Sequence, residues 1–394
     1  MKWNVFLSGD RGGKLKKLSL VAFIVLSVVA FGSQNLPAMD LLASGMATPE
    51  TISPANGAYG GGFSNYYFVP DPGRTSGVPT DLTNVWKVDK TSGTTTLFSH
   101  PTNTTTVGGL FLPSGWGDYS NKFMTVGFTN FGTPGVDDYR SGYFNVYNAN
   151  GTYTTPLTLQ GVHNVANYLP KTPVLAPAGW GSFAGNLLIA DGAPAVYAID
   201  SNWQKKDLIT NPVYPELSRF GLAFAPASWG RVGGQLMTST NKNELDQAGN
   251  LVITGRITAV DSTGVETKWA EFSIPNTLNG LRQMAFTPDG FIPGQGELLL
   301  VSVSGSSFGG GTLGDIWAFN SDGQMVATLK HTLGLTKFDP RGLYFEGDKL
   351  LISDASDPIY IATSTDFQVV PVPPPIVLVG PALLGLLAFR RKRG

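Results

Sequence analysis

The chain has 394 residues, a formal net charge of −1 and only 14% charged residues, well below the ~25% usual for soluble domains. The near-neutral charge gives no indication of a nucleic-acid partner. The absence of cysteine excludes a disulfide framework, a thiolate metal site and a cysteine nucleophile. Abundant glycine (49 residues), threonine, serine and asparagine favour strands and turns over helices.

The first predicted element is a signal peptide at residues 1–32. Three lysines between residues 14 and 17 precede an apolar run, and polar residues follow it. A basic start, an apolar core and small residues before a cleavage point are typical of secretory signal peptides. We expect cleavage after Gly32, with Ala38 as a second candidate site, and an uncleaved membrane anchor is the alternative. Residues 33–50 are then predicted to be a linker.

One phrase recurs through residues 51–368: a short apolar strand, a loop with proline and glycine, and a second apolar strand. "VLAPAGWGSFAGNLLIAD", from Val174, and "LAFAPASWGRVGGQLMTS", from Leu222, are two copies. The segments "NLLIA" and "ELLLV" are predicted to be inner strands with little exposure. The loop of each full copy holds an aromatic residue that we expect to wedge between neighbouring units: Trp116, Trp180, Trp229 and Phe291.

A second phrase follows each copy of the first. It alternates apolar and polar residues, turns at Asp or Asn with Gly, and alternates again, as in "GRITAVDSTGVETKWAEF". This is the signature of a β-hairpin. Turn chemistry accounts for the acidic residues at these turns, Asp89, Asp200 and Asp261.

The two phrases together predict six units of four strands, with about 53 residues in each unit. Propeller blades run at roughly 40–50 residues and are four-stranded sheets. The predicted fold class is therefore all-β, a six-bladed β-propeller. The sequence does not determine how the ring closes, because the first unit lacks a clear first strand. The last unit has a weak fourth strand at "DFQVV", residues 366–370, and residues near Ile52 are candidates to complete a blade.

Residues 369–394 are predicted to be a sorting signal with a hinge, a transmembrane segment and a basic end. Pro371 to Pro375 favour polyproline II. The apolar residues 376–389 would reach ~21 Å as a helix, and the preceding residues extend this span. The basic end would stay in the cytoplasm, which places the body of the protein outside: Arg390, Arg391, Lys392 and Arg393.

This tail resembles the Val-Pro-x-Pro variant of the PEP-CTERM sorting signal, although it lacks a Glu after the first proline. The resemblance covers about the last 25 residues and rests on the basic end, the apolar span and the residues Val370, Pro371, Val372 and Pro373. It implies a Gram-negative bacterium that makes extracellular polysaccharide, and processing by signal peptidase and an exosortase-type membrane protease. The expected localisation is export, transient membrane anchoring and then the cell surface or secretion. An ordinary C-terminal anchor is the alternative.

The body resembles known propellers at two levels. "LLIADGAPAVYAID" and "LLISDASDPIYIAT" are similar to the strand-loop-strand core of NHL and SMP-30-like propellers. "APAGWGSFAGNLLIAD" is more closely similar to an uncharacterised propeller family whose members often carry PEP-CTERM tails, and this resemblance covers most of residues 100–365. Both resemblances imply the fold and little about activity, because propellers host many unrelated functions.

If the strands of a blade are called A to D from the channel outward, the B–C and D–A loops share one face of the propeller. Five residues are candidates for a ligand site on this face, at the channel. Asp191 and Asp354 end the second strands of two units, Arg282 and Arg341 occupy equivalent D–A positions, and His163 precedes the third blade. A small anion or a cation such as calcium would suit these groups. The alternative is that the aspartates cap their own loops and the arginines pair with them. No cofactor and no metal ligand set is indicated.

Three functions remain open from the sequence. The leading hypothesis is a non-catalytic exported propeller that binds a ligand or builds a matrix. The second is a metal-dependent hydrolase or lactonase of the SMP-30-like kind, which would need acidic and amide side chains from several blades at one point. The third is a scaffold whose Thr- and Asn-rich surface binds extracellular polysaccharide.

Overall fold

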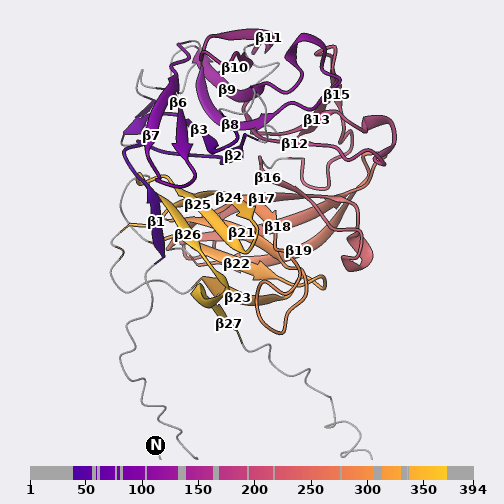
Figure 1. Cartoon of the computed structure of the whole chain (residues 1–394). Coiled ribbons are helices and arrows are strands. Elements are labelled where there is room, and N and C mark those ends of the chain that lie inside the picture. Colours follow the sequence, from indigo (N-terminus) through magenta and orange to yellow (C-terminus); the bar gives the residue numbers. More distant parts are fainter. Residues whose placement is uncertain are drawn as a thin grey trace, which may run out of the picture. The chain divides into compact units, whose positions relative to one another are not determined.

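The computed structural model describes residues 39–370 apart from 56–58, 60–62, 76–77, 80–82, 103, 132–138, 163–167, 193–194, 216–217, 276, 306–312, 330–334 and 336. In this part of the chain six antiparallel sheets of four or five strands surround a channel, so the predicted six-bladed β-propeller is confirmed (Figure 1). The expected signal peptide and residues 371–394 of the expected tail lie outside it. Among the described residues no helix is long and apolar enough to cross a membrane.

Blades 1 to 4 take their strands in chain order, with the first strand innermost. Blade 1 is built from β2 (Ser53–Pro54), β3 (Tyr66–Asp71), β6 (Asn84–Asp89) and β7 (Thr95–Ser99). Blade 2 is built from β8 (Thr105–Phe111), β9 (Phe123–Phe131), β10 (Tyr139–Tyr147) and β11 (Tyr153–Leu159). Blade 3 is built from β12 (Pro170–Leu175), β13 (Leu187–Asp191), β14 (Val196–Ile199) and β15 (Lys205–Asp207). Blade 4 is built from β16 (Arg219–Phe224), β17 (Leu236–Leu245), β18 (Leu251–Val260) and β19 (Glu266–Ile274).

Blades 5 and 6 each recruit a strand from an end of the described chain. Blade 5 contains β20 (Leu278–Phe286), β21 (Leu299–Gly305), β22 (Asp315–Phe319), β23 (Met325–Leu329) and a fifth strand, β27 (Phe367–Val369). Blade 6 contains β24 (Pro340–Glu346), β25 (Lys349–Asp354), β26 (Ile359–Ala362) and, as its outer strand, β1 (Asp40–Ala43). The remaining elements are short: β4 (Arg74–Thr75), β5 (Val78–Pro79), η1 (Gly117–Tyr119), η2 (Gly181–Phe183), η3 (Gly230–Val232) and η4 (Ser364–Asp366).

Closure of the ring differs from the prediction in two places. The expected linker, 33–50, contributes β1, which pairs antiparallel with β26, so the first and last colours of Figure 1 lie side by side. The segment "DFQVV" forms β27 on β23 of blade 5 and is not the fourth strand of blade 6. A capping box at η4 turns the chain toward blade 5, where Phe367 is buried with its ring 5.7 Å from that of Phe291. Residues next to Ile52 do complete blade 1, as its inner strand β2.

The loop aromatics wedge between blades, as predicted. Each ring packs against an aromatic residue of the next blade at a centroid distance of 4.7–5.2 Å: Trp116 on Trp203, Trp180 on Phe224, Trp229 on Phe286 and Phe291 on Phe345. Blade 1 has its own wedge, Tyr59, which the sequence analysis missed and which packs 5.8 Å from Phe111 of blade 2. These contacts, with the fully buried strands β13 and β21, form the core between sheets.

In blades 1, 2, 4 and 5 the turn between the third and fourth strands, the C–D turn, packs against the outer strand of the preceding blade or the residue just after it. The carboxylates of Asp89, Asp200 and Asp261 accept backbone N–H groups of their own turns, as predicted. Glycine is required because a Cβ at Gly264 would stand 2.0 Å from the carbonyl oxygen of Leu208 in blade 3. In blade 3 Trp203 takes this place with φ at 62°, and its indole is buried against Trp116.

Candidate functional site at the channel mouth

Three blades end their second strand with an aspartate that caps the loop leading to the inner strand. Asp191 Oδ1 accepts the N–H of Leu169 at 2.7 Å, and Asp354 Oδ1 accepts the N–H of Asp339 at 3.0 Å. Asp71, which the sequence analysis missed, accepts the N–H of Thr48 at 2.9 Å in blade 1. The two predicted site residues Asp191 and Asp354 thus have a structural role in shaping the channel face.

Arg341 pairs with a carboxylate that the sequence analysis did not single out. Its Nη2 lies 2.7 Å from Asp339 Oδ2, and Ser304 Oγ donates to Asp339 Oδ1 at 2.5 Å. Burial acts to lower the pKa of Arg341, but the charges of Asp339, Glu50 and Asp354 raise it above its ordinary value. For the acid Asp354, burial raises the pKa, with a further contribution from the charge of Asp339, and this effect outweighs that of its hydrogen bonds.

Arg282 and Arg341 lie within the inner strands β20 and β24, and not in the D–A loops where the sequence placed them. Arg282 stands four residues before Phe286, and Arg341 stands four residues before Phe345. Both Phe residues lie at or next to the C-terminal end of their strand. The register of the inner strands with their partners gives the equivalent positions in blades 1, 3 and 4: Glu50, Lys171 and Phe220.

Three of these equivalent residues from consecutive blades stack together. Lys171 Nζ of blade 3 lies 3.6 Å from the centroid of the Phe220 ring in blade 4. Arg282 Cζ of blade 5 lies 5.0 Å from the same centroid. The face of an aromatic ring attracts cations, so the Phe220 ring interacts with a cationic group from the blade on each side. We call Lys171, Phe220 and Arg282 the cationic stack.

Hydrogen bonds between blades fix the backbone that carries the stack. Thr172 Oγ1 donates to the carbonyl oxygen of Phe220 at 2.7 Å, and Ser239 Oγ donates to that of Arg282 at 2.9 Å. Ser302 Oγ makes the same bond to the carbonyl oxygen of Arg341 at 3.2 Å. Because these links join every blade from 3 to 6 at the same level, the positions around the mouth are held by the fold itself.

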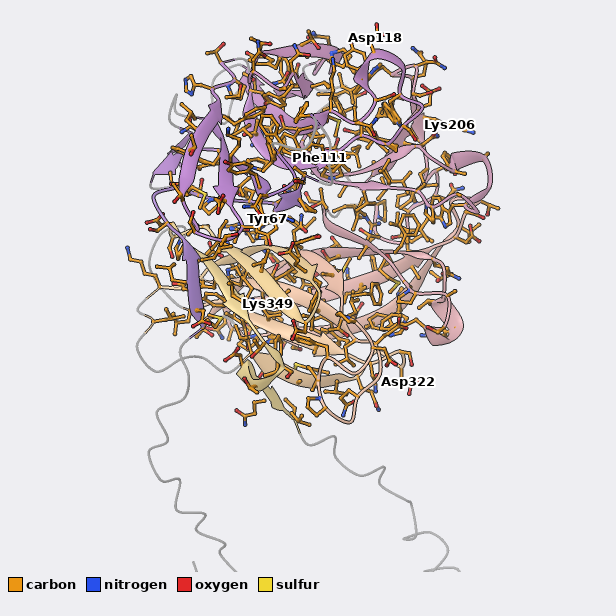
Figure 2. The ribbon with its side chains drawn as sticks, viewed as in Figure 1. Tyr67, Phe111, Asp118, Lys206, Asp322 and Lys349 are labelled. Carbon is orange, nitrogen blue, oxygen red and sulfur yellow. The ribbon has the colours of Figure 1, made fainter. Side chains whose placement is uncertain are left out.

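A cavity of about 320 Å³ lies inside the channel, directly below the stack. All six inner strands or the residues just before them contribute to its wall, including Thr172 and Gln283, which follow Lys171 and Arg282 in the chain. Gln283 Nε2 of blade 5 donates to Thr172 Oγ1 of blade 3 at 3.2 Å, so this amide passes in front of blade 4. Phe111, which also lines the cavity, lies nearer the middle of the molecule than Lys206 at the rim (Figure 2).

The structure brings together only part of the predicted site. The cationic stack contains Arg282 but adds Lys171 and Phe220, whereas Arg341 belongs to the ion pair with Asp339. His163 lies outside the described residues. Within the described ranges, no group of three or more His, Cys, Asp or Glu side chains is placed to hold a metal ion. Lys171 and Phe220 gave no signal in the sequence, because the equivalent positions in blades 1 and 5 hold other residue types, Glu50 and Arg282.

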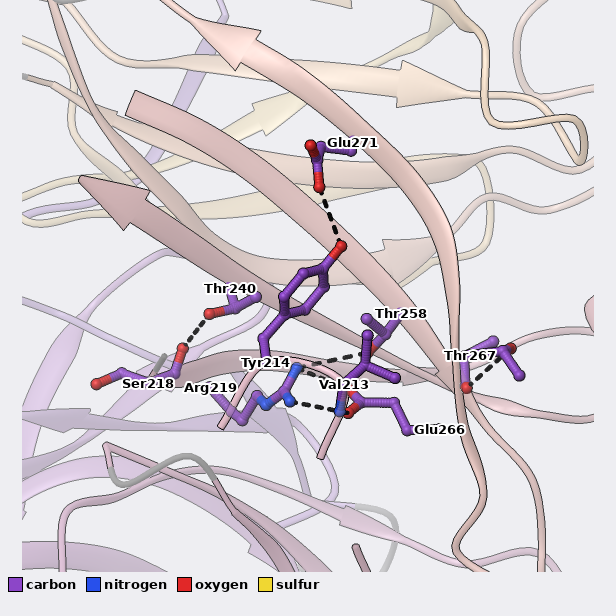
Figure 3. A network of polar contacts seen from close by, with 10 residues as sticks. Val213, Tyr214, Ser218, Arg219, Thr240, Thr258, Glu266, Thr267 and Glu271 are labelled. Atoms are coloured by element: carbon purple, nitrogen blue, oxygen red, sulfur yellow. Dashed lines mark hydrogen bonds and ion pairs between the residues drawn. The ribbon is translucent and has the colours of Figure 1, made fainter. Parts of the chain in front are cut away.

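A second buried charge network lies in blade 4, outside the residues that line the channel (Figure 3). Arg219 and Glu266 form a two-pronged ion pair, with Nη1 2.8 Å from Oε1 and Nη2 3.0 Å from Oε2, and both side chains are fully buried. The N–H of Val213 donates to Glu266 Oε2 at 2.6 Å, and the OH of the next residue, Tyr214, donates to Glu271 at 3.0 Å. Burial raises the pKa of this phenol to about 12. This network holds the loop between blades 3 and 4 in place.

Solved structures share this architecture at low sequence identity. A glucose dehydrogenase is 12% identical with a TM-score of 0.50, and the match covers 83% of this chain and 99% of that protein. The soluble aldose sugar dehydrogenase from Escherichia coli, in its apo-form, is 11% identical with the same TM-score and coverage. A periplasmic gluconolactonase from Pseudomonas aeruginosa is 16% identical, with a TM-score of 0.40 over 82% of this chain and 89% of that one. No protein-family model matches the sequence, and a search of curated proteins finds no match. The fold and the sugar dehydrogenase likeness define the class, a six-bladed β-propeller.

Proposed function

We propose that this chain is an exported β-propeller that binds a small anionic molecule at the mouth of its channel. One observation carries the proposal: Lys171 and Arg282 come from two blades and converge on the ring of Phe220 in the blade between them. Ammonium and guanidinium groups are the side chains that bind carboxylates and phosphates. Like charges at the mouth of a concave site also concentrate the field that attracts an anion.

The nearby carboxylates support a binding role and not a catalytic one. Asp71, Asp191 and Asp354 accept backbone N–H groups, and Asp339 pairs with Arg341. These contacts give the carboxylates a structural role in shaping the face. The cationic stack is therefore the part of the mouth that we assign to the ligand.

The binding proposal is tested by calorimetry on the full-length protein purified in mild detergent. The titrants are gluconate, simple carboxylates, inorganic phosphate and calcium chloride. We expect at least one anion to bind, and Arg282→Gln to lower its affinity at least tenfold. Lys206→Gln serves as the matched control, because Lys206 lies on β15, the outer strand of blade 3. Calcium binding without anion binding, or wild-type affinity in Arg282→Gln, would overturn the proposal.

We further propose that the protein is exported through residues 1–32, held briefly in the membrane by its tail and released at the cell surface by an exosortase-type protease. The support is the order of the sequence features at both ends of the chain. It is also consistent that the N–H of Val370 donates to the carbonyl of Val326 at 2.8 Å, because the proline hinge then begins at the rim of blade 5. Extracellular polysaccharide would surround the released propeller.

Mass spectrometry of the protein recovered from the producing cell tests release. We expect the mature C-terminus to lie among residues 371–375, just beyond the strand β27. An intact peptide that contains Arg390 to Arg393 on most mature copies would contradict this part of the proposal.

A further inference from the structure

The hairpin between the second and third strands of blade 4 is longer than the ring requires. The second strands of blades 3 and 6 have 5 and 6 residues, whereas β17 and β18 have 10 residues each. Among the described residues, the inner strand β16 pairs with β17 up to Thr240, and β19 pairs with β18 from Ile253 onward. Residues 241–252 therefore form a two-stranded ribbon beyond the blade, on the face of the channel mouth. We call it the blade 4 extension.

The blade 4 extension is a regular hairpin with a closed turn. Each of its residues on β17 has a cross-strand partner on β18, and the last such pair is Leu245 with Leu251. The N–H of Asp246 donates to the carbonyl oxygen of Asn250 at 2.9 Å. Asp246 Oδ1 in turn accepts the N–H groups of Ala248 and Asn250, each at 2.8 Å. The shape of the ribbon is thus set before any partner arrives.

Apolar side chains at the end of the extension face solvent. Leu245 is 70% exposed, Leu251 is 44% exposed and Val252 is 40% exposed. Leu245 and Leu251 are directly opposite each other, so their side chains adjoin on one face of the ribbon. Adjoining exposed apolar side chains mark surfaces that contact another macromolecule.

One edge of β17 in the extension directs backbone groups away from β18. In an antiparallel pair the N–H and C=O groups of successive residues alternate between the two edges. Because Asp246 bonds across the turn, Glu244 and Lys242 also direct theirs toward β18. Asn243 and Leu245 therefore direct theirs to the opposite edge, where no strand of the described residues pairs with them. An open edge of this kind is a template for pairing with another chain.

We infer that a second copy of this chain pairs antiparallel with this edge, about a two-fold axis at Asn243. The edge is self-complementary about this residue, because Lys242 precedes it and Glu244 follows it. In the pair, Asn243 exchanges both backbone hydrogen bonds with its own copy. Lys242 of each copy stands directly opposite Glu244 of the other, as a two-fold axis requires.

The charges at this edge favour a second copy as the occupant. Opposite charges directly across two strands are stabilising, whereas like charges there are destabilising. Within one copy Lys242 Nζ lies 2.5 Å from Glu244 Oε1, and the two side chains are 31% and 55% exposed. An exposed pair of this kind is worth little, so both groups can turn to the other copy at small cost. Lysines alone would protect the edge from pairing, but a lysine and a glutamate on either side of one residue match themselves.

A single cysteine on the axis tests the pairing. The chain has no cysteine, so Asn243→Cys introduces the only thiol. In a hydrogen-bonded antiparallel pair the two Cα atoms are about 5.5 Å apart, which a disulfide can span. We expect the full-length variant in mild detergent to form a disulfide-linked dimer under mild oxidation, and non-reducing electrophoresis detects it.

Gln247→Cys is the matched control for the cross-link. Gln247 is an exposed residue of the same hairpin, in its turn, and would stand more than about 20 Å from its own copy. This variant should stay largely monomeric. Failure of Asn243→Cys to cross-link, or equal cross-linking of the two variants, would overturn the inference.

Charge reversal gives a second readout without a covalent bond. Lys242→Glu and Glu244→Lys each place like charges opposite each other, and each should weaken dimerisation at least about tenfold. The double variant restores opposite charges and should recover most of the dimer. Sedimentation velocity on the full-length proteins measures this. A monomeric natural protein, or a dimer that the single reversals leave unchanged, would overturn the inference. None of these changes touches Lys171 or Arg282, so the outcome is independent of the proposed anion site.

Discussion

Asp354 and Glu266 are both buried carboxylates, but the protein holds them in different ways. Asp354 uses one oxygen, Oδ1, to accept the N–H groups of Asp339 and Ser356 and the hydroxyl of Ser356. Glu266 offers both oxygens to the guanidinium of Arg219. The first arrangement works with a neutral side chain, whereas the second leaves a buried positive charge if the carboxylate is lost. The two residues should therefore respond oppositely to neutralisation.

Neutralising Glu266 should destabilise the protein strongly. We expect Glu266→Gln to lower the free energy of unfolding by about 3–5 kcal/mol, because Arg219 stays buried without a counter-charge. The double variant Arg219→Met with Glu266→Leu should recover most of this loss. Chemical denaturation measures the effect. The exposed pair Lys242–Glu244 supplies the control, since Glu244→Gln should change stability by about 0–1 kcal/mol. Equal effects at the two sites would contradict the argument.

Neutralising Asp354 should have a pH-dependent effect of the other sign. Its pKa is raised in the folded protein, chiefly by burial, so ionisation costs stability once the pH exceeds the value of the unfolded chain. Asp354→Asn keeps the Oδ1 acceptor and removes this ionisation. We expect the stability of the variant relative to the natural protein to improve as the pH rises from about 4 to about 8. Thermal melts across this range test it, and a constant difference would refute the assigned cause.

At the scale of elements, the outer strands decide how the ring closes. β1 completes blade 6, and Ala43 and Met46, on and just after it, are buried in the cluster between blades 6 and 1. β27 instead widens blade 5, where Phe367 joins the core with Phe291 and Val326. Each end of the described chain is thus an edge strand, and the two edges lie on neighbouring blades.

Removing β1 should open the last blade. We expect a variant that lacks residues 1–44 to melt at least about 5 °C below one that lacks residues 1–38, because a few kcal/mol of strand pairing and burial are lost. Differential scanning calorimetry of both truncated proteins measures the difference. Coincident melting curves would show that β1 does not contribute to closure.

At the scale of the whole molecule, small residues let neighbouring inner strands approach one another around the channel. A Cβ at Gly342 of blade 6 would stand 2.2 Å from the carbonyl oxygen of Glu50, at the junction with blade 1. A Cβ at Gly221 of blade 4 would stand 2.4 Å from the carbonyl oxygen of Arg282 in blade 5. The ring is therefore tight at the level of the cationic stack.

Adding one methyl group at this junction should weaken the closed ring. We expect Gly342→Ala to lower the free energy of unfolding by about 1–3 kcal/mol, because the backbone of blade 1 must move to make room. Gly179→Ala is the control, since no atom lies within 4 Å of its added Cβ and the change should be neutral or slightly stabilising. Denaturation curves compare the two variants. If the Gly342→Ala protein is as stable as the control, the junction between blades 6 and 1 has room for a methyl group and the argument is contradicted.

Much of the fold was predictable because the local sequence of each blade encodes its strands and turns. The sequence of the units repeats strands with alternating apolar residues, turns with Asp or Asn and Gly, and an aromatic residue five positions after the inner strand. The structure confirms these features. The same spacing in blade 1 would have revealed Tyr59, and the Asp that ends "YYFVPD" would have revealed Asp71. These features depend on neighbours in sequence, so a single chain displays them without its tertiary structure.

The rest depended on contacts between distant residues, which no local pattern encodes. β1 and β27 are only 4 and 3 residues long, so their sequences do not indicate which strand each pairs with. Trp203 stands where other turns have glycine, because burial of its indole against blade 2 offsets an unfavourable φ. Lys171 and Phe220 became neighbours of Arg282 only when the ring closed. The sequence by itself determined the repeating unit and its turns; the tertiary structure decided the closure and the channel mouth, because both arise where blades meet.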